Sequence, residues 1–240
     1  MVIGVALGTA HVKEKHARPG FLSNFILGSQ DGLVNVLGII LGVSAVTSNV
    51  QLILVAGLAA LGAESISMGA VAYTSTLARR KLYIKEEERE ISEMKNIPKM
   101  ERKEVRNVLA GWGYRGKKLD SLCDDICSNR KAWLEFMMAF ELRLQPTAKT
   151  EPMNSFTLVF LATIIGSVIP LLPFFFYPNI GADQIIAIVI SAITLFVVGF
   201  YEAKTTVGSL WRSGLQMLVI GMVAGFAGFL IGKLVGAAPI

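Results

Sequence analysis

Two pairs of glutamates flank a proline in the most polar part of the chain. Glu90 and Glu93 precede Pro98, and Glu101 and Glu104 follow it. Side chains three residues apart share one face of a helix, and a proline ends a helix, so the two helices can fold back as a hairpin and bring four carboxylates together. Clustered carboxylates repel one another unless a cation lies between them. The pattern therefore predicts a cation site, and the ordinary alternative is a solvated acidic face.

A second set of donors follows in the same polar segment. Met137 and Glu141 stand four residues apart on a predicted helix. Carboxylate oxygens suit Mg²⁺, Ca²⁺, Mn²⁺ and Fe²⁺, and a thioether sulfur shifts the preference toward transition metals. A dedicated zinc site would use histidine and cysteine, but the only histidines, His11 and His16, lie near the N-terminus. These donor types favour a divalent transition metal such as Fe²⁺ or Mn²⁺.

Three further candidate residues lie in apolar surroundings. Asp31 is inside the first apolar segment, and Glu64 and Met68 lie four residues apart in the second. An ionised carboxylate in hydrocarbon is costly, so intramembrane acids usually face a cavity, a partner or an ion path. These three residues are therefore candidates for a translocation path. The alternatives are a helix cap or buried polar pair for Asp31 and ordinary packing for Met68.

The composition and its distribution indicate a membrane protein. The 240 residues are 53% hydrophobic and 17% charged, with a mean hydropathy of +0.56, whereas a soluble domain carries roughly a quarter charged residues. Five apolar segments are long enough for a bilayer of about 30 Å: 21–46, 51–77, 156–177, 185–200 and 215–235. The sequence therefore predicts an all-α integral membrane protein with a helical, metal-binding insert between the second and third spans.

The distribution of Lys and Arg predicts the orientation. The insert holds most of them and should face the cytoplasm, whereas 47–50 and 178–184 carry none and should face the other side. The basic residues at the N-terminus follow a short apolar start, the reverse of a secretory signal. A formal charge of +5 in such a protein gives no reason to expect nucleic-acid binding.

The predicted domains are a cytoplasmic N-terminal segment (1–20), spans one and two (21–78), a cytoplasmic helical metal-binding domain (79–154) and spans three to five (155–240).

Local signals predict the elements in more detail. Within the insert we expect helices over 79–95, 99–109, 120–127 and 131–144, the first of them continuing the second span. Pro170 and Pro173 are expected to bend or close the third span. Cys123 and Cys127 are read as reduced, packed thiols, with a soft-metal pair as the alternative. Pairs of glycines four residues apart let helices approach closely in lipid, either inside one subunit or between subunits: Gly28 and Gly32, Gly38 and Gly42, Gly221 and Gly225, Gly228 and Gly232.

The chain resembles the vacuolar iron transporter family from about Phe21 to its C-terminus. The stretch of aromatic, methionine and glutamate residues between the second and third spans is the most specific part of the resemblance. The matching motifs are Ser29-Gln30-Asp31-Gly32-Leu33, Ser65-Ile66-Ser67-Met68-Gly69 with Tyr73, Trp133-Leu134-Glu135-Phe136-Met137-Met138-Ala139-Phe140-Glu141-Leu142, and Val168-Ile169-Pro170-Leu171-Leu172-Pro173.

The resemblance implies a homodimer with five transmembrane helices that exchanges Fe²⁺, as substrate, for protons. The metal path would lie at the dimer interface, where Asp31 and Met68 match path residues. One departure concerns the second span, where family members carry an acid at the position of Ala60 and a small residue at that of Glu64. The cytoplasmic domain would bind several metal ions through Glu90, Glu93, Glu101, Glu104, Met137 and Glu141.

We therefore expect a secondary active transporter that exports Fe²⁺ from the cytosol in exchange for protons. The same residues would also suit Mn²⁺, Co²⁺ or Zn²⁺ as the transported metal. The sequence fits a vacuolar membrane and a prokaryotic plasma membrane equally well. One alternative function is a membrane-anchored metal buffer or sensor, but such a protein would not need an acid inside a span, as Asp31 is. The other is a carboxylate-metal ferroxidase, but di-iron enzymes of the ferritin type pair their glutamates with histidines, and the insert has none. No phosphate loop, dinucleotide fingerprint or nucleophile–base arrangement is present, so no enzyme and no organic cofactor are expected.

Overall fold

Helices form the whole of the regular structure. The computed structural model describes residues 19–176, 179–206 and 208–236, and no strand occurs within them. The N-terminal segment predicted over 1–20 lies, but for its last two residues, outside this description, as do His11, His16 and Tyr177. The chain divides into two compact units, Met1–Ser65 with Leu161–Ile240, and Ile66–Phe160.

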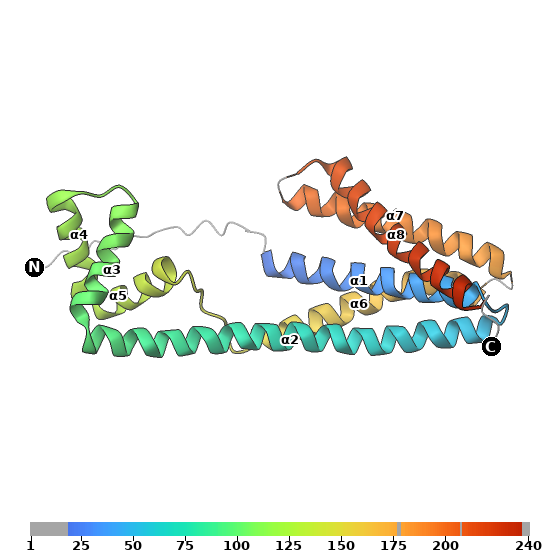
Figure 1. The fold of residues 1–240 in the computed structure, drawn as a ribbon, viewed down its shortest axis with the longest axis horizontal. Helices are drawn as coiled ribbons and strands as arrows, with labels where there is room; N and C mark the ends of the chain where they lie inside the picture. Colours follow the sequence, from blue (N-terminus) through green and yellow to red (C-terminus); the bar gives the residue numbers. More distant parts are fainter. Residues whose placement is uncertain (1–18, 177–178, 207, 237–240) are drawn as a thin grey trace, which may run out of the picture. The chain divides into compact units, whose positions relative to one another are not determined.

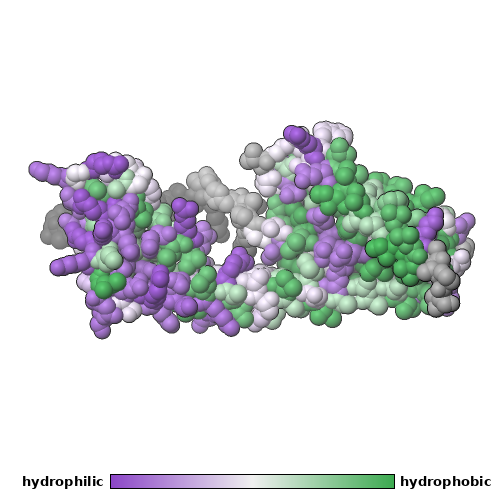
Figure 2. Space-filling view, in the orientation of Figure 1, coloured by the Kyte–Doolittle hydropathy of each residue, from purple (hydrophilic) through white to green (hydrophobic). Residues whose placement is uncertain are grey.

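Among the described residues, five helices are long and apolar enough to cross a membrane, which confirms the predicted all-α membrane fold. On the face shown in Figure 2, apolar side chains predominate over the span-bearing unit, and polar ones predominate over the helices of the insert. The helices, which Figure 1 labels, are α1 (Pro19–Ser44), α2 (Val50–Asn96), α6 (Glu151–Phe176), α7 (Ile180–Thr205) and α8 (Leu210–Gly236).

The helix boundaries extend the sequence predictions in three places. The helix α2 runs without a break for 47 residues, so the second span does continue into the insert. Of the two alternatives for Pro170 and Pro173, bending or closing the third span, closing is wrong, because α6 passes through both prolines and ends at Phe176. Prolines are tolerated inside membrane helices, where neighbouring groups satisfy the freed backbone carbonyls. The helix α7 begins earlier than hydropathy predicted, at a cap in which Asn179 Oδ1 accepts from the Ala182 amide at 3.3 Å.

Glycines bring α1 against α8 within one subunit. A Cβ atom at Gly42 would lie 2.8 Å from the Gly228 carbonyl oxygen, and one at Gly228 would lie 2.8 Å from the Gly38 carbonyl carbon. Gly232 likewise meets the backbone of Gly42. Such distances exclude any side chain, so these glycines serve close packing inside the subunit.

Gly228→Ala is expected to destabilise the span-bearing unit. The added methyl group meets backbone atoms of Gly38, which cannot rotate away, so α1 and α8 must separate at a cost of about 1–3 kcal/mol. Thermal unfolding in detergent measures the effect. Gly20→Ala is the control, because nothing lies within 4 Å of a Cβ atom there. Equal melting temperatures for the two variants would contradict the packing described.

The unit Ile66–Phe160 has its own small core. Four elements of the insert follow α2: α3 (Pro98–Gly111), α4 (Gly116–Ser128), α5 (Arg130–Phe136) and the π-helix η1 (Met137–Glu141). Cys123 is buried and donates to the Arg102 carbonyl at 3.4 Å, and burial beside Cys123 raises the pKa of the Cys127 thiol to about 12, so both behave as packed thiols. The buried residues of this core are Val105, Leu109, Leu119, Cys123, Phe136 and Met137.

The last insert helix departs from the predicted regular helix over 131–144. After Phe136 the chain widens into η1, where the Leu142 amide donates to the Met137 carbonyl at 3.0 Å, five residues back. Arg143 then takes a left-handed conformation with φ of 55° and ends the element. Single π-turns of this kind occur frequently at functional sites.

Candidate metal centre

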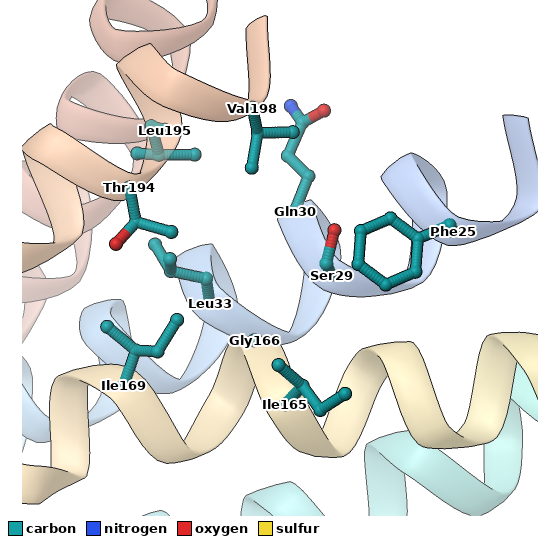
Figure 3. A pocket seen from close by; sticks show the side chains of 10 residues that line it. All are labelled: Phe25, Ser29, Gln30, Leu33, Ile165, Gly166, Ile169, Thr194, Leu195 and Val198. Carbon is teal, nitrogen blue, oxygen red and sulfur yellow. The ribbon is translucent and has the colours of Figure 1, made fainter. Parts of the chain in front are cut away.

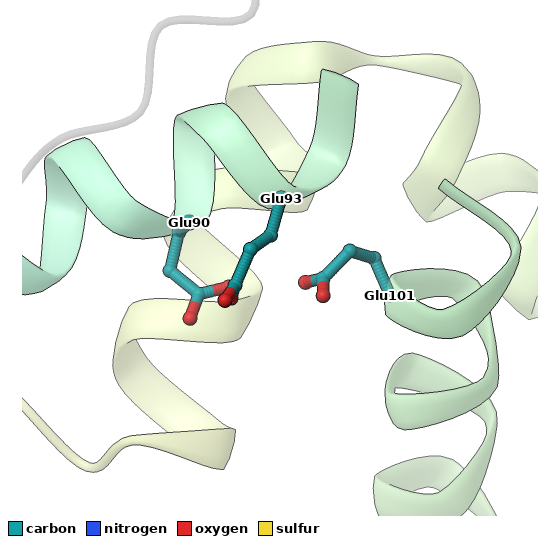
Figure 4. Close-up of side chains that lie close together, drawn as sticks. All are labelled: Glu90, Glu93 and Glu101. Atoms are coloured by element: carbon teal, nitrogen blue, oxygen red, sulfur yellow. The ribbon is translucent and has the colours of Figure 1, made fainter. Parts of the chain in front are cut away.

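Three glutamates of the insert converge on one point. Glu90 and Glu93 extend from α2 and Glu101 extends from the first turn of α3, across the turn at Pro98. One carboxylate oxygen of each lies within 4.8 Å of the others, and the three groups point toward one another (Figure 4). The hairpin predicted from the spacing is therefore present, and a single divalent cation can bind all three carboxylates.

Two of the three carboxylates are buried and only partly satisfied by hydrogen bonds. Glu90 and Glu101 are each 1% exposed. One oxygen of each, and one of Glu141, is buried without a hydrogen-bond partner. Buried polar atoms are nearly always paired, and an unpaired buried carboxylate oxygen is costly. A metal ion bound by the group would satisfy the unpaired oxygens of Glu90 and Glu101, which a solvated acidic face would not leave buried.

Burial and mutual repulsion favour the protonated acids. Burial, followed by the neighbouring carboxylates of Glu104 and Glu90, raises the pKa of Glu101 to about 8. Burial, followed by Glu104 and Glu90, also raises the pKa of Glu141. A metal ion entering the cluster must therefore displace at least one proton from these acids at neutral pH.

The other three predicted ligands are not members of this group. Glu104 and Glu141 are half-buried and act electrostatically on the cluster, although neither belongs to the group of three within 4.8 Å. Met137 is fully buried and packs in the apolar core with Val105 and Phe136. Met137 lies in the same π-helix as Glu141. Its side chain packs in the apolar core without a metal ion.

The acids of the first two spans are joined through a residue that the sequence analysis did not single out. Asn35 Nδ2 lies 3.3 Å from Asp31 Oδ1 and also hydrogen-bonds Glu64 Oε1. Asp31 and Glu64 are thus held together between α1 and α2. Met68, one turn after Glu64 along α2, is half-buried. The four-residue spacing from Asp31 to Asn35 indicates that the two side chains share one face of α1. It does not indicate which residues of α2 lie opposite that face.

Comparison with known proteins identifies the family of the chain. The model of the VIT family matches residues 22–233. The chain belongs to the VIT family. It is 32% identical to vacuolar iron transporter 1 of Arabidopsis thaliana, over 94% of this chain and 90% of that protein. It is also 32% identical to vacuolar iron transporter 2 of Oryza sativa subsp. japonica, over 92% and 91%, and 30% identical to the vacuolar iron transporter of Plasmodium falciparum, over 88% and 81%.

Arg89 is a second residue at the candidate metal centre of this VIT-family chain that the sequence did not indicate. Its guanidinium lies 3.4 Å from Glu90 and 3.8 Å from Glu93, and 3.0 Å from Glu86 outside the cluster. The Arg89 side chain is 49% exposed. It approaches Glu90 through Oε1, and the other oxygen of Glu90 is the unpaired one.

A separate cavity of about 100 Å³ in this VIT-family chain lies between α1, α6 and α7 (Figure 3). Its hydroxyl groups are used locally, since Ser29 donates to Ile26 O at 3.3 Å and Thr194 to Ile190 O at 2.8 Å. Asp31 is not among the lining residues. The cavity therefore offers no cluster of metal ligands, and the candidate path lies on another face of α1.

Proposed function

We propose that this protein transports a divalent transition metal, Fe²⁺ foremost, across a membrane in exchange for protons. The observation that carries the proposal is the convergence of Glu90, Glu93 and Glu101 within 4.8 Å, with unpaired buried oxygens on Glu90 and Glu101. Five apolar helices in the same chain supply the membrane part. The relatives are named vacuolar iron transporters, which supports iron as the substrate and a transporter rather than an enzyme.

The proposed mechanism divides the work between the insert and the spans. Glu90, Glu93, Glu101 and Glu104, with Met137 and Glu141, capture the metal on the cytoplasmic side. The path through the spans uses Asp31, Glu64 and Met68 in a homodimer, and the metal leaves the cytosol as protons enter it. Carboxylates suit this exchange because each can hold either a proton or a metal ion.

The proposed orientation is tested by labelling of introduced cysteines. Lys118 on α4 and Ser48 between α1 and α2 are both exposed. An impermeant maleimide is expected to label Lys118→Cys only from the cytoplasmic side and Ser48→Cys only from the other side, because basic residues stay cytoplasmic. The unsubstituted chain is the control, since Cys123 is buried and the raised pKa of Cys127 keeps its thiol unreactive. Labelling of both variants from one side would contradict this topology.

The transport activity is tested with the full chain in proteoliposomes. An imposed pH gradient should drive accumulation of Fe²⁺, and the order of rates among Fe²⁺, Mn²⁺, Co²⁺ and Zn²⁺ gives the preference. Metal uptake should also move protons in the opposite direction, which a trapped pH dye detects. A chain that binds metal but takes up none under any gradient would instead be a membrane-anchored buffer or sensor.

A further inference from the structure

Asn35 connects acids that belong to different spans. Its side-chain nitrogen lies 3.3 Å from Asp31 Oδ1, one turn earlier on α1, and the same nitrogen hydrogen-bonds Glu64 Oε1 on α2. Asp31 and Glu64 are half-buried and Asn35 is exposed on the subunit. One amide therefore fixes the relation between two carboxylates from residues far apart in the sequence.

No basic side chain takes this place within the described residues. The ion pairs found in that part of the chain all lie in the insert. An amide has two N–H donors and no charge, so it can hold two carboxylates without neutralising them. A lysine or arginine at position 35 would instead cancel the negative charge that attracts a cation.

We infer that Asn35 is a positioning residue for transport, which holds Glu64 beside Asp31 so that the two carboxylates meet a passing divalent cation as one pair of oxygen donors. A free glutamate side chain loses rotamer freedom when it binds metal, and a fixed partner reduces that loss. Removing a group that orients a metal-binding side chain typically lowers affinity or activity about 10- to 100-fold. The inference rests on the proposed function, because it gives Asn35 a part in the translocation path.

A double-mutant cycle in proteoliposomes tests this role, with Mn²⁺ as the probe and a pH gradient as the driving force. Asn35→Leu retains the size and removes the donors, and Glu64→Gln retains the size and removes the charge. Each is expected to lower the initial uptake rate about tenfold. The double variant should be no slower than Glu64→Gln alone, because Asn35 acts through Glu64. A merely structural role predicts that the two losses multiply.

Two controls separate this inference from general damage. Asn24→Leu makes the same exchange elsewhere on α1 and should transport at the wild-type rate, and Mn²⁺ binding by the insert should be equal in every variant. Asn35→Ala, which adds no bulk, replaces the leucine variant if that one does not fold. Wild-type rates for the Asn35 variants, or multiplying losses, would overturn the inference and leave the proposed function standing. A wild-type chain that binds Mn²⁺ but takes up none would overturn the proposed function, and the inference with it.

Discussion

Replacing Glu90, Glu93, Glu101 and Glu104 together by alanine is expected to abolish divalent-metal binding by the insert while the five spans remain folded. The change removes every carboxylate of the converging group and also Glu104, whose carboxylate raises the pKa of Glu101. The remaining Met137 and Glu141 offer too few donors, since Mn²⁺ and Fe²⁺ prefer several oxygen ligands. Calorimetric titration of the full chain in detergent with Mn²⁺ measures the loss.

The same four positions changed to glutamine give a matched variant of nearly native shape. It should lose binding as well, because amides carry no charge to compensate a divalent cation. Glu88→Gln is the control, since this residue lies on α2 and is exposed. A quadruple variant that binds as many ions as the parent would reduce the cluster to an acidic surface.

Metal binding by the unaltered insert should weaken as the pH falls. The pKa of Glu101 is raised to about 8, so below that pH the metal must displace its proton, and the apparent affinity falls about tenfold per pH unit for each proton released. Above pH 8 the pH dependence of the metal affinity should flatten.

The raised pKa of Glu101 also means that the metal-free protein loses stability as the pH rises from about 4.5 toward 8. Bound Mn²⁺ should restore that stability. Glu101→Gln should weaken both pH dependences, and the raised pKa of Glu141 should leave a remainder.

The converging glutamates were predictable from the sequence because each step of the argument is local. A three-residue spacing sets the face of a helix, and Pro98 sets the position of the reversal, so the approach of Glu101 to Glu90 follows without knowledge of the remaining chain. The continuous α2 was predictable for the same reason, since nothing between Leu77 and Asn96 interrupts a helix.

Features that depend on the register of separate helices were not predictable in this way. The hydrogen bond from Asn35 to Glu64 requires the relative height and rotation of α1 and α2, which one sequence does not contain. The π-turn from Met137 to Glu141 similarly depends on how the insert core accepts one additional residue per turn. Helix α6 continues through Pro170. A membrane helix tolerates an internal proline where neighbouring groups satisfy the freed carbonyl, which depends on tertiary contacts that one sequence does not contain.

Asp31→Asn is expected to abolish pH-driven metal transport while leaving metal binding by the insert unchanged. Exchange of metal for protons requires a group in the spans that can hold either ion, and a carboxylate does so because an arriving cation expels its proton. Asparagine retains the size and an oxygen donor, but it has no acidic proton to exchange. Asp31 also accepts the Asn35 hydrogen bond at 3.3 Å, which an amide oxygen at position 31 can still accept. The loss should therefore reflect the charge rather than the packing of α1.

Proteoliposomes that contain the Asp31→Asn chain decide the matter by uptake of Fe²⁺ under an imposed pH gradient, with Mn²⁺ calorimetry of the same preparation as the measure of the intact insert. Met68→Leu is the companion variant, because it retains the bulk and removes only the sulfur donor. It should slow transport or alter the order of preference among metals without removing the coupling to protons. Uptake by Asp31→Asn at the wild-type rate, with protons still moving in the opposite direction, would make Asp31 structural and would leave Glu64, held by the same amide, as the acid that carries the exchange.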